Sequence, residues 1–372
     1  MQHRIPIFFL GILILTGAFT ACRTQPVTAV KTGQIRTVED KIITTDSLDA
    51  FIRQAMDDTG VPGLSIAIIN DAGIVYHRTF GVTNLNSGLR VTDSTLFEAA
   101  SLSKPLFAYF VMKMVEKGVL DLDAPIYPSI AHIMPPEAID SASFDAYQLI
   151  TPRMILCHAT GMPNWAEGKP IHIAFPPGTG FSYSGEAYQH LGAALGTLLE
   201  VGWQSRLDSV FQKEVAEPLG LRNSFFTWNE HIEGHKASGH RQGKPTDAME
   251  HGKAFGPGYS LHTEAYDYAL FLTEMMKEKH LDKNLLAEML LEQNKFTPDN
   301  ELLKYGQTGW GLGFARRPTE HGLRYMHTGN NHDFQSYACF YKEGGYGLVL
   351  FINADTIEPF YELLGTYLGD KF

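Results

Sequence analysis

Strand-forming segments lie near both ends of this chain, and helix-forming segments lie between them. On the N-terminal side, the apolar runs 64–69 and 74–80 flank an Asn-Asp-Ala-Gly turn at 70–73, which predicts a β-hairpin. On the C-terminal side, 335–341 and 346–352 flank a turn with two glycines and predict a second hairpin. The simplest arrangement is one antiparallel sheet to which both ends of the chain contribute strands.

Helical patterns surround this predicted sheet. An amphipathic stretch runs from Asp46 to about Gly60, and a helical segment at 358–368 closes the chain. Between these, the pattern is mainly helical and is interrupted by long Gly- and Pro-rich loops. We therefore predict an α+β fold (an α/β sandwich), in which an antiparallel sheet is flanked by helices and carries an inserted, mainly helical lobe over roughly 106–272. The cleft between sheet and lobe is the expected place for a functional site.

The charge balance excludes one class of partner. The chain of 372 residues has 30 Lys and Arg against 41 Asp and Glu, a formal net charge of −11, and it has no Lys- or Arg-rich run. Nucleic-acid binders carry a basic patch, so we expect no nucleic-acid partner. The sequence leaves the oligomeric state open.

The first 22 residues predict an export signal. Arg4 gives a positive start, and 5–19 form an apolar run that is too short to span a bilayer comfortably. The run ends in Phe-Thr-Ala-Cys, which resembles a bacterial lipoprotein signal in which Cys22 is lipidated and becomes the mature N-terminus. The alternatives are a plain secretory signal with an incidental cysteine and an uncleaved membrane anchor.

Residues 23–45 are polar and have little periodicity, so they predict a flexible tether with a span on the order of 25 Å. The folded body, 46–372, would then lie close to a membrane without entering it. We expect an exported protein that Cys22 anchors to a bacterial cell-envelope membrane, in the outer membrane or facing the periplasm if the cell is Gram-negative. An aspartate directly after the lipidated cysteine is associated with retention in the inner membrane. This chain has Arg23 at that position.

The two other cysteines are Cys157 and Cys339. A disulfide is open to them outside the cytoplasm, but nothing in the sequence brings them together, so we expect two separate buried thiols. Cys157 also precedes His158. Adjacent residues rarely face each other on a helix and the segment is apolar, so packing is favoured over a thiol–imidazole pair.

Two further sets of side chains have a structural and a functional interpretation. The histidines fit no closed set of metal ligands, so we predict solvent-facing loop residues and no metal site; they are His231, His235, His240, His251 and His262. Three aromatic residues in glycine-containing loops are candidates for the cleft wall or for simple packing; they are Trp165, Tyr259 and Trp310.

Ser101 and Lys104 are the strongest chemical signal in the chain. Pro105 follows them, and proline is tolerated only near a helix start, so the pair is predicted on a first helical turn. Positions i and i+3 share a helix face, which lets the lysine amine reach the serine hydroxyl and take its proton. The partial positive charge of a helix N-terminus favours the developing oxyanion and the loss of the lysine proton.

Two more motifs follow this pair. Tyr183 lies in a Phe-Ser-Tyr-Ser-Gly loop, and a phenolate favoured by Lys104 would shuttle protons to a leaving group. His327, Thr328 and Gly329 come just before the second hairpin, where a glycine on an edge strand lets a substrate backbone approach closely.

The order S-x-x-K, Y-S-x and H-T-G, with long separations, resembles the serine beta-lactamase and penicillin-binding-protein-like hydrolase family, with its class C beta-lactamase, DD-peptidase and esterase branches most similar. The connecting segments agree with this resemblance over 96–101, 118–123, 150–163 and 217–221. The resemblance covers essentially all of 46–372 and implies a beta-lactamase/transpeptidase-like fold.

The resemblance also implies roles. Ser101 would be the acylated nucleophile, Lys104 its activating partner and Tyr183 the general base or acid. The backbone N–H groups of Ser101 and Asn330 would form the oxyanion hole. The substrate-binding positions would be Gly185, His327, Thr328 and Gly329. The resemblance implies no cofactor.

Two positions depart from the family pattern. His327 stands where beta-lactamases usually carry a lysine, and a neutral histidine anchors a substrate carboxylate less strongly. Gly185 stands where an asparagine is usual, which removes an amide that would hold the substrate; Ser184, Glu186 or Asn331 could compensate. Peptidases and esterases of the family also use H-T-G, so His327 weakens the prediction of a beta-lactamase more than that of a hydrolase. Gly185 weakens the prediction of beta-lactam or peptide chemistry.

We therefore predict a serine hydrolase that forms an acyl-enzyme on Ser101 with a small ester or amide or a D-amino-acid peptide. The first alternative is a DD-carboxypeptidase or a weak class C-type beta-lactamase. An alternative from another class is a non-catalytic lipoprotein that binds cell-wall fragments, a peptide or a protein partner in the cleft.

Overall fold

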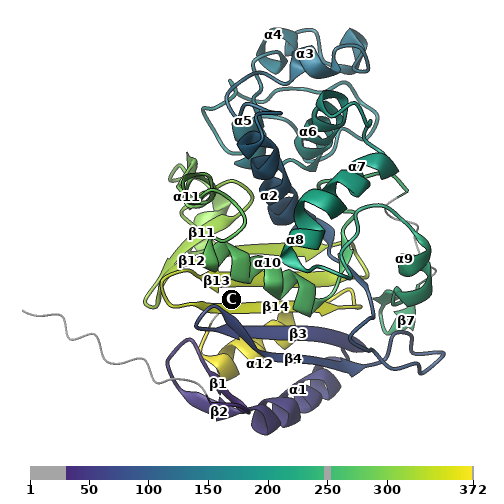
Figure 1. The fold of residues 1–372 in the computed structure, drawn as a ribbon, viewed down its shortest axis with the longest axis vertical. Helices are drawn as coiled ribbons and strands as arrows, with labels where there is room; N and C mark the ends of the chain where they lie inside the picture. The colour runs from purple at the N-terminus through teal and green to yellow at the C-terminus, as the bar shows by residue number, and fades with distance from the viewer. Residues whose placement is uncertain (1–30, 247–252, 371–372) are drawn as a thin grey trace, which may run out of the picture.

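The computed structural model describes residues 31–246 and 253–370, and one antiparallel sheet of eight strands organises it (Figure 1). The strands are β3 (Gly63–Asn70), β4 (Gly73–Gly81), β9 (Asn294–Lys295), β10 (Gly309–Trp310), β11 (Ala315–Thr319), β12 (Gly322–Asn330), β13 (Gln335–Tyr341) and β14 (Tyr346–Ile352). Their order in the sheet is β4-β3-β14-β13-β12-β11-β10-β9. Ile66 of β3 lies opposite Leu350 of β14. The prediction of a sheet built from both chain ends is confirmed.

Helices cover both faces of the sheet. On one face α1 (Thr45–Thr59) packs against α12 (Glu358–Leu368), and on the other α10 (Ala265–Lys277) packs on β3 and β14 (Figure 1). Side chains alternate between the faces of a strand. Accordingly, Ala67 belongs to the apolar core on the α10 face, whereas Ile66 belongs to the core on the α1 face. Both cores bury β3, which explains its nearly continuous apolar sequence.

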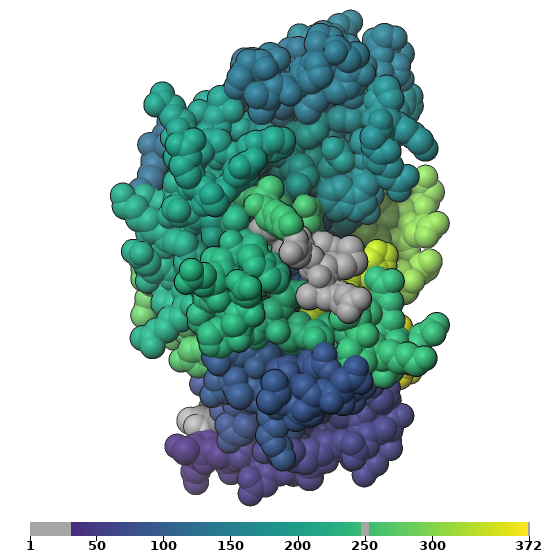
Figure 2. Space-filling model, turned by 90° about the vertical axis from the view of Figure 1, so that its right-hand side faces the viewer, coloured from purple at the N-terminus to yellow at the C-terminus, as the bar shows by residue number. Residues whose placement is uncertain are grey.

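The remaining helices form the lobe and its connections. They are α2 (Ser103–Glu116), α3 (Tyr127–Ile130), α4 (Phe144–Tyr147), α5 (Pro152–Leu156), α6 (Gly185–Leu198), α7 (Ser205–Phe211), α8 (Glu217–Leu219), α9 (Glu230–His235) and α11 (Lys283–Leu290). In the space-filling view the lobe is the upper part of the molecule (Figure 2). The prediction that the lobe extends to residue 272 is wrong at its end, because α10 packs on the sheet.

Short elements link these parts. The pair of strands β5 (Phe97–Glu98) and β8 (His262–Thr263) is antiparallel, as is the pair β6 (His240–Arg241) and β7 (Lys244–Pro245). Four irregular helical turns cover Ala100–Leu102, Pro136–Ala138, Gln212–Ala216 and Glu301–Tyr305.

Part of the predicted tether is folded. The strands β1 (Gln34–Arg36) and β2 (Ile42–Thr44) form an antiparallel pair, and Ile35 is fully buried. The backbone N–H of Arg36 donates to Asn70 Oδ1 at 2.9 Å, and Asn70 Nδ2 donates to the Arg36 carbonyl at 2.8 Å. These contacts tie the segment to the end of β3, so the prediction of flexibility is wrong for 34–44.

The predicted export signal and Cys22 lie outside the described residues. Within 31–246 and 253–370, no helix combines the length and the apolar character needed to cross a membrane. Cys157 and Cys339 are both buried, free thiols, and they belong to the cores on opposite faces of the sheet. The prediction of two separate buried thiols is confirmed.

Candidate active site

Ser101 lies in a tight turn at the start of α2. The preceding residue, Ala100, has a φ of +50°, a left-handed conformation that residues other than glycine rarely adopt. Hydrogen bonds hold this backbone: Ser103 Oγ donates to the Ala100 carbonyl at 2.6 Å, and Ser336 Oγ donates to the Ala99 carbonyl at 2.8 Å. Such strain persists only where the surroundings fix it, and it is common at functional sites.

Lys104 contacts the nucleophile position directly. Its Nζ donates to Ser101 Oγ at 3.0 Å and to the Gly258 carbonyl at 2.8 Å. The side chain is almost completely buried, and this burial lowers the pKa of Lys104 to about 7. Removal from water disfavours the charged amine, so a large share of it is neutral near pH 7. The lysine is therefore equipped to accept the serine proton.

Tyr183 lies beside this pair, with its ring centroid 4.8 Å from Lys104 Nζ. Burial raises the pKa of Tyr183, and a hydrogen bond with Ser101 opposes this rise only in part. The phenol therefore keeps its proton at neutral pH. The prediction of a phenolate favoured by Lys104 is wrong, because the same burial that retains the phenol proton also removes the lysine charge.

His158 supports Tyr183 from behind. The two ring centroids are 4.3 Å apart, and the backbone N–H of Ser184 donates to His158 Nδ1 at 3.1 Å. Burial, with smaller contributions from Lys104 and His327, lowers the pKa of His158 well below its usual range. The histidine is a neutral packing residue, and Cys157 beside it is buried. The preference for packing over a thiol–imidazole pair is confirmed.

The end of β12 forms the opposite wall. This strand pairs with β13 as far as Asn330, but with β11 only from Gly322 to Met326, so 327–330 lie beyond the end of β11. A Cβ on Gly329 would lie 2.3 Å from the Ala99 carbonyl oxygen. Because Gly329 has no Cβ, the segment before Ser101 can approach the strand closely. The sequence suggested that a substrate backbone would make this close approach.

His327 lies behind the wall. It is 3% exposed and packs against Tyr183 and Trp310, with ring centroids 6.0 Å and 5.5 Å away. Burial lowers the pKa of His327 to about 3, so the imidazole is neutral. Trp310 and Tyr183 pack against it, and it is not among the residues that line the cavity. Thr328 is exposed but also lies outside the cavity lining.

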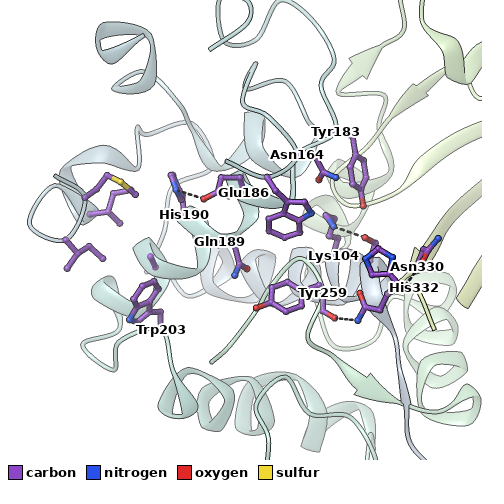
Figure 3. A pocket seen from close by; sticks show the side chains of 17 residues that line it. Lys104, Asn164, Tyr183, Glu186, Gln189, His190, Trp203, Tyr259, Asn330 and His332 are labelled. Atoms are coloured by element: carbon purple, nitrogen blue, oxygen red, sulfur yellow. Dashed lines mark hydrogen bonds and ion pairs between the residues drawn. The ribbon is translucent and has the colours of Figure 1, made fainter. Parts of the chain in front are cut away.

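A cavity of about 750 Å³ opens in front of these groups (Figure 3). The four residues predicted for catalysis and the oxyanion hole all lie in its lining: Ser101, Lys104, Tyr183 and Asn330. Of the two backbone groups proposed for the oxyanion hole, one comes from the start of α2 and the other from the end of β12. Trp165 and Tyr259 also line it, whereas Trp310 is buried behind it.

Gly185 lies at the start of α6, under an indole. A Cβ on Gly185 would lie 2.5 Å from Cζ2 of Trp165, so the tryptophan occupies the space of a side chain at this position. The backbone N–H of Gly185 donates to Asn164 Oδ1 at 2.9 Å. Asn164 lines the cavity, and the sequence gave no signal for it because the contact depends on how the 163–166 loop folds onto α6.

The three residues considered as substitutes for the missing asparagine are already engaged. Ser184 caps α6, because its Oγ accepts from the Ala187 N–H at 3.0 Å. Glu186 accepts from the Ala166 N–H at 3.0 Å, and Asn331 Nδ2 donates to Glu98 Oε2 at 2.8 Å.

The predicted loop histidines divide into two groups. His231 and His235 stack with ring centroids 4.3 Å apart, while His240 and His262 are buried. The prediction that the latter two face solvent is wrong. His251 lies outside the described residues. In the described part of the chain, no group of three or more His, Cys, Asp or Glu side chains is arranged to hold a metal ion.

The chain is similar in sequence to known proteins over much of its length. Penicillin-binding protein 4 from Amycolatopsis lactamdurans is 24% identical over 345 residues, which cover 83% of this chain and 86% of that protein. Esterase EstB from Burkholderia gladioli is 27% identical over 208 residues, which cover 48% of this chain and 50% of the esterase. The chain thus spans about half the length of the esterase.

Solved structures show the fold. The octameric penicillin-binding protein homologue from Pyrococcus abyssi superposes with a TM-score of 0.73 and 23% identity, over 88% of this chain and 78% of that one. The D-alanine carboxypeptidase AmpC from Burkholderia cenocepacia gives 0.70 and 20%, over 87% of this chain and 100% of that one. The predicted beta-lactamase/transpeptidase-like fold is confirmed.

The family assignment depends on the whole body of the chain. The Beta-lactamase family profile matches residues 48–369, from α1 to the end of α12. This range contains the sheet, the lobe and every group that lines the cavity. The chain therefore belongs to the beta-lactamase family.

Proposed function

We propose that this protein is a serine hydrolase that forms an acyl-enzyme on Ser101 and prefers carboxylic esters to beta-lactams and D-amino-acid peptides. The observation that carries the proposal is the contact of Lys104 Nζ with Ser101 Oγ at 3.0 Å, combined with a pKa of about 7 for that lysine. A base with a pKa near the working pH is the most effective proton acceptor.

In the first step, neutral Lys104 accepts the proton of Ser101 Oγ, and the oxygen attacks the ester carbonyl carbon. The N–H groups of Ser101 and Asn330 stabilise the oxyanion of the tetrahedral intermediate. The intermediate collapses when the bond to the leaving alcohol oxygen breaks. The neutral Tyr183 phenol supplies the proton to that oxygen and recovers a proton from Lys104. Water then hydrolyses the serine ester by the reverse sequence of proton transfers.

The charges around the cavity favour esters. D-amino-acid peptides and penicillins carry a carboxylate near the scissile bond, which a fixed cation would hold. Among the described residues that line the cavity, Lys104 is the only lysine or arginine, and it is committed to Ser101. His327 is buried and neutral. An ester without a carboxylate does not require such a cation for binding.

The position of Trp165 supports the same preference. In the family pattern an asparagine at position 185 holds the substrate amide, whereas here the indole lies in that space. An amide substrate would lose a hydrogen-bond partner that an ester needs less, because an ester has no N–H to satisfy.

Intact-protein mass after exposure to a fluorophosphonate and, separately, to a penicillin tests the proposal. We expect a phosphonate adduct on the wild-type protein and none on Ser101→Ala. Turnover of an ester, a beta-lactam and a D-Ala-D-Ala peptide is then compared. Ester turnover above the other two supports the proposal; the reverse ranking favours the carboxypeptidase or beta-lactamase alternative. Folded protein that forms no adduct with either probe favours the non-catalytic binding alternative.

We further propose that Cys22 carries a lipid anchor at the cell envelope. The support is the sequence at 5–22 alone. The test is membrane fractionation of the full chain and of Cys22→Ala, with mass analysis of the mature N-terminus. We expect the wild type with the membranes and a lipidated Cys22, and the variant without lipid. An unmodified Cys22 in the wild type overturns this proposal.

A further inference from the structure

The catalytic cavity continues well beyond the nucleophile. Trp203 lies at the opposite end of the cavity from Lys104 and Asn330 (Figure 3). One wall is a face of α6 that runs from Glu186 to Ala193, two helical turns along, and at 1.5 Å per residue this wall is about 10 Å long. A substrate as small as an acetate ester fills only the end near the nucleophile.

The far end of the cavity is apolar. We define the apolar arm as the lining residues Ile130, Ile133, Met134, Ala193 and Trp203. Ile133 is 45% exposed and Trp203 is 51% exposed, so both leave apolar surface accessible in the cavity. Apolar surface that is gathered in one concave site, with a few polar groups, is characteristic of ligand pockets.

The tryptophans support this assignment. The chain has four, and the two that are exposed, Trp165 and Trp203, both line the cavity. Trp165 lies over Gly185 at the start of α6, whereas Trp203 lies at the far end of the cavity (Figure 3). Exposed indoles at both ends of one cavity provide apolar contact along its length.

The charged groups between the two ends are satisfied by protein partners. Glu186 Oε1 lies 3.6 Å from His190 Nε2, and Oε2 of the same carboxylate accepts from the Ala166 N–H. His190 Nδ1 in turn lies 2.7 Å from the Tyr147 hydroxyl. Both oxygens of the Glu186 carboxylate and both ring nitrogens of His190 thus have partners within the protein.

We propose that the apolar arm binds the hydrocarbon tail of the substrate, so that the preferred substrates are esters with an unbranched tail of medium length. This inference rests on the proposed esterase function and adds the substrate class. A wall of about 10 Å along α6 matches a tail of roughly eight carbons in extended form. The tail belongs to either the acyl or the alcohol part of the ester, since the chemistry of recognition is the same.

Two series of esters test the proposal with the wild-type protein. The acyl series is the p-nitrophenyl esters from acetate to dodecanoate, and the alcohol series is the alkyl acetates from methyl to dodecyl. We expect kcat/KM to rise about two- to fourfold per methylene in one series up to roughly eight carbons, and then to level off. The series that rises identifies the side of the ester that carries the tail. A flat or falling profile in both series overturns the proposal.

Variants of the arm locate the effect. In the series that rises, Trp203→Ala and Ile133→Ala should reduce turnover of the eight-carbon ester at least fivefold more than turnover of the shortest ester. Leu149→Ala is the matched control, because Leu149 is a 61% exposed apolar residue of the same lobe that does not line the cavity. It should leave the ratio unchanged. A ratio that is unchanged in all three variants means that the tail binds elsewhere and overturns the proposal.

Binding to Ser101→Ala separates the failure of this inference from the failure of the esterase proposal. Two pairs of ligands are compared by tryptophan fluorescence: methyl octanoate with methyl butanoate, and octyl acetate with butyl acetate. In at least one pair, we expect the eight-carbon ester to bind at least tenfold more tightly. Such a preference without ester turnover by the wild type retains the arm and overturns only the esterase proposal. Ester turnover with equal affinities within both pairs overturns the arm alone.

Discussion

Lys236 and Glu98 form a buried ion pair behind the strand that leads to the nucleophile. The Lys236 Nζ lies 2.7 Å from Glu98 Oε1, and the two side chains are 4% and 2% exposed. The second carboxylate oxygen accepts from Nδ2 of Asn331, which lines the cavity. Glu98 therefore links β5 to the loop between β12 and β13. This loop directly follows Asn330, whose backbone N–H belongs to the proposed oxyanion hole.

Removal of one partner of this pair should destabilise the fold strongly. We expect Lys236→Met to lower the free energy of unfolding by about 3–5 kcal/mol, because it leaves a buried carboxylate without its cation. The double variant Glu98→Gln with Lys236→Met should recover at least half of the loss. Urea unfolding measures both. Equal stabilities of the single and the double variant would contradict a buried ionised pair.

The lysine of the active site should give a characteristic pH profile. Because burial lowers the pKa of Lys104 to about 7, kcat/KM for an ester should rise with a midpoint near pH 7 and stay level above it. Three neighbours of Lys104 do not titrate in this range, since the pKa of Tyr183 is raised and those of His158 and His327 are lowered. A midpoint of the rise in kcat/KM below pH 5 or above pH 9 would contradict the assignment.

The same group makes a prediction for stability. The pKa of Lys104 in the folded protein, about 7, lies below its value of roughly 10.4 in an unfolded chain. The cost of burying the lysine is therefore fully present below pH 7 and is lost as the pH rises towards 10.4. We expect Lys104→Met to be inactive and to raise the melting temperature on the order of 5 °C at pH 6. This gain should shrink as the pH approaches 10, and calorimetry across this range is the measurement.

Replacement of Gly185 should depend on Trp165. A Cβ at this position would lie 2.5 Å from the indole, so Gly185→Asn alone should cost about 1–3 kcal/mol of stability without a gain in amide turnover. With Trp165→Ala in addition, the asparagine has room, and the ratio of amide to ester turnover should rise. Trp165→Ala alone is the control. A shift of the ratio by the single Gly185→Asn change would show that the indole does not block this position.

Gly329 should be sensitive to a single methyl group. We expect Gly329→Ala to destabilise the fold by about 2–3 kcal/mol and to lower kcat at least tenfold, because the new Cβ would press on Ala99 and displace the turn that carries Ser101. The matched control is Gly234→Ala in α9, where the space around the Cβ is open and φ is not left-handed. Circular dichroism melts and ester kinetics compare them. Normal kinetics of Gly329→Ala would mean that the strand and the turn move independently.

The predictable parts of the fold are those that short segments encode. The Asn-Asp-Ala-Gly sequence contains a two-residue turn in which Asp71 and Ala72 adopt positive φ values of 50° and 55°. The helix at α1 ends at Gly60, whose φ is +70°. Such signals depend on neighbouring residues, so the sequence predicts them correctly.

The sequence does not predict elements that lack a local pattern of apolar or turn residues. The strands β9 and β10 have two residues each, too few for any periodicity. The β1–β2 hairpin lies in a polar segment, and it is held by Asn70, which lies beyond α1. Its order comes from a tertiary contact that composition does not reveal.

In the active site, too, contacts between neighbours in the sequence are predictable, and contacts between distant segments are not. Ser101 and Lys104 are neighbours on a helical turn, so their contact follows from their spacing. The placement of Trp165 over Gly185 and of Trp310 over His327 depends on loops and strands from distant parts of the chain. The protonation states of Lys104 and Tyr183 depend on burial, which their motifs do not encode.

The interior position of β14 in the sheet determines when the molecule can fold. This strand pairs with β3 on one side and β13 on the other, yet it is the last strand to be synthesised. A nascent chain therefore holds the β3–β4 hairpin with an open edge, and the helices of the lobe, while the middle of the sheet is still absent. Pairing between the ends of a long chain is slow, and an open strand edge invites aggregation. Completion of the chain, rather than the emergence of any one part, is thus the event that permits the sheet to close.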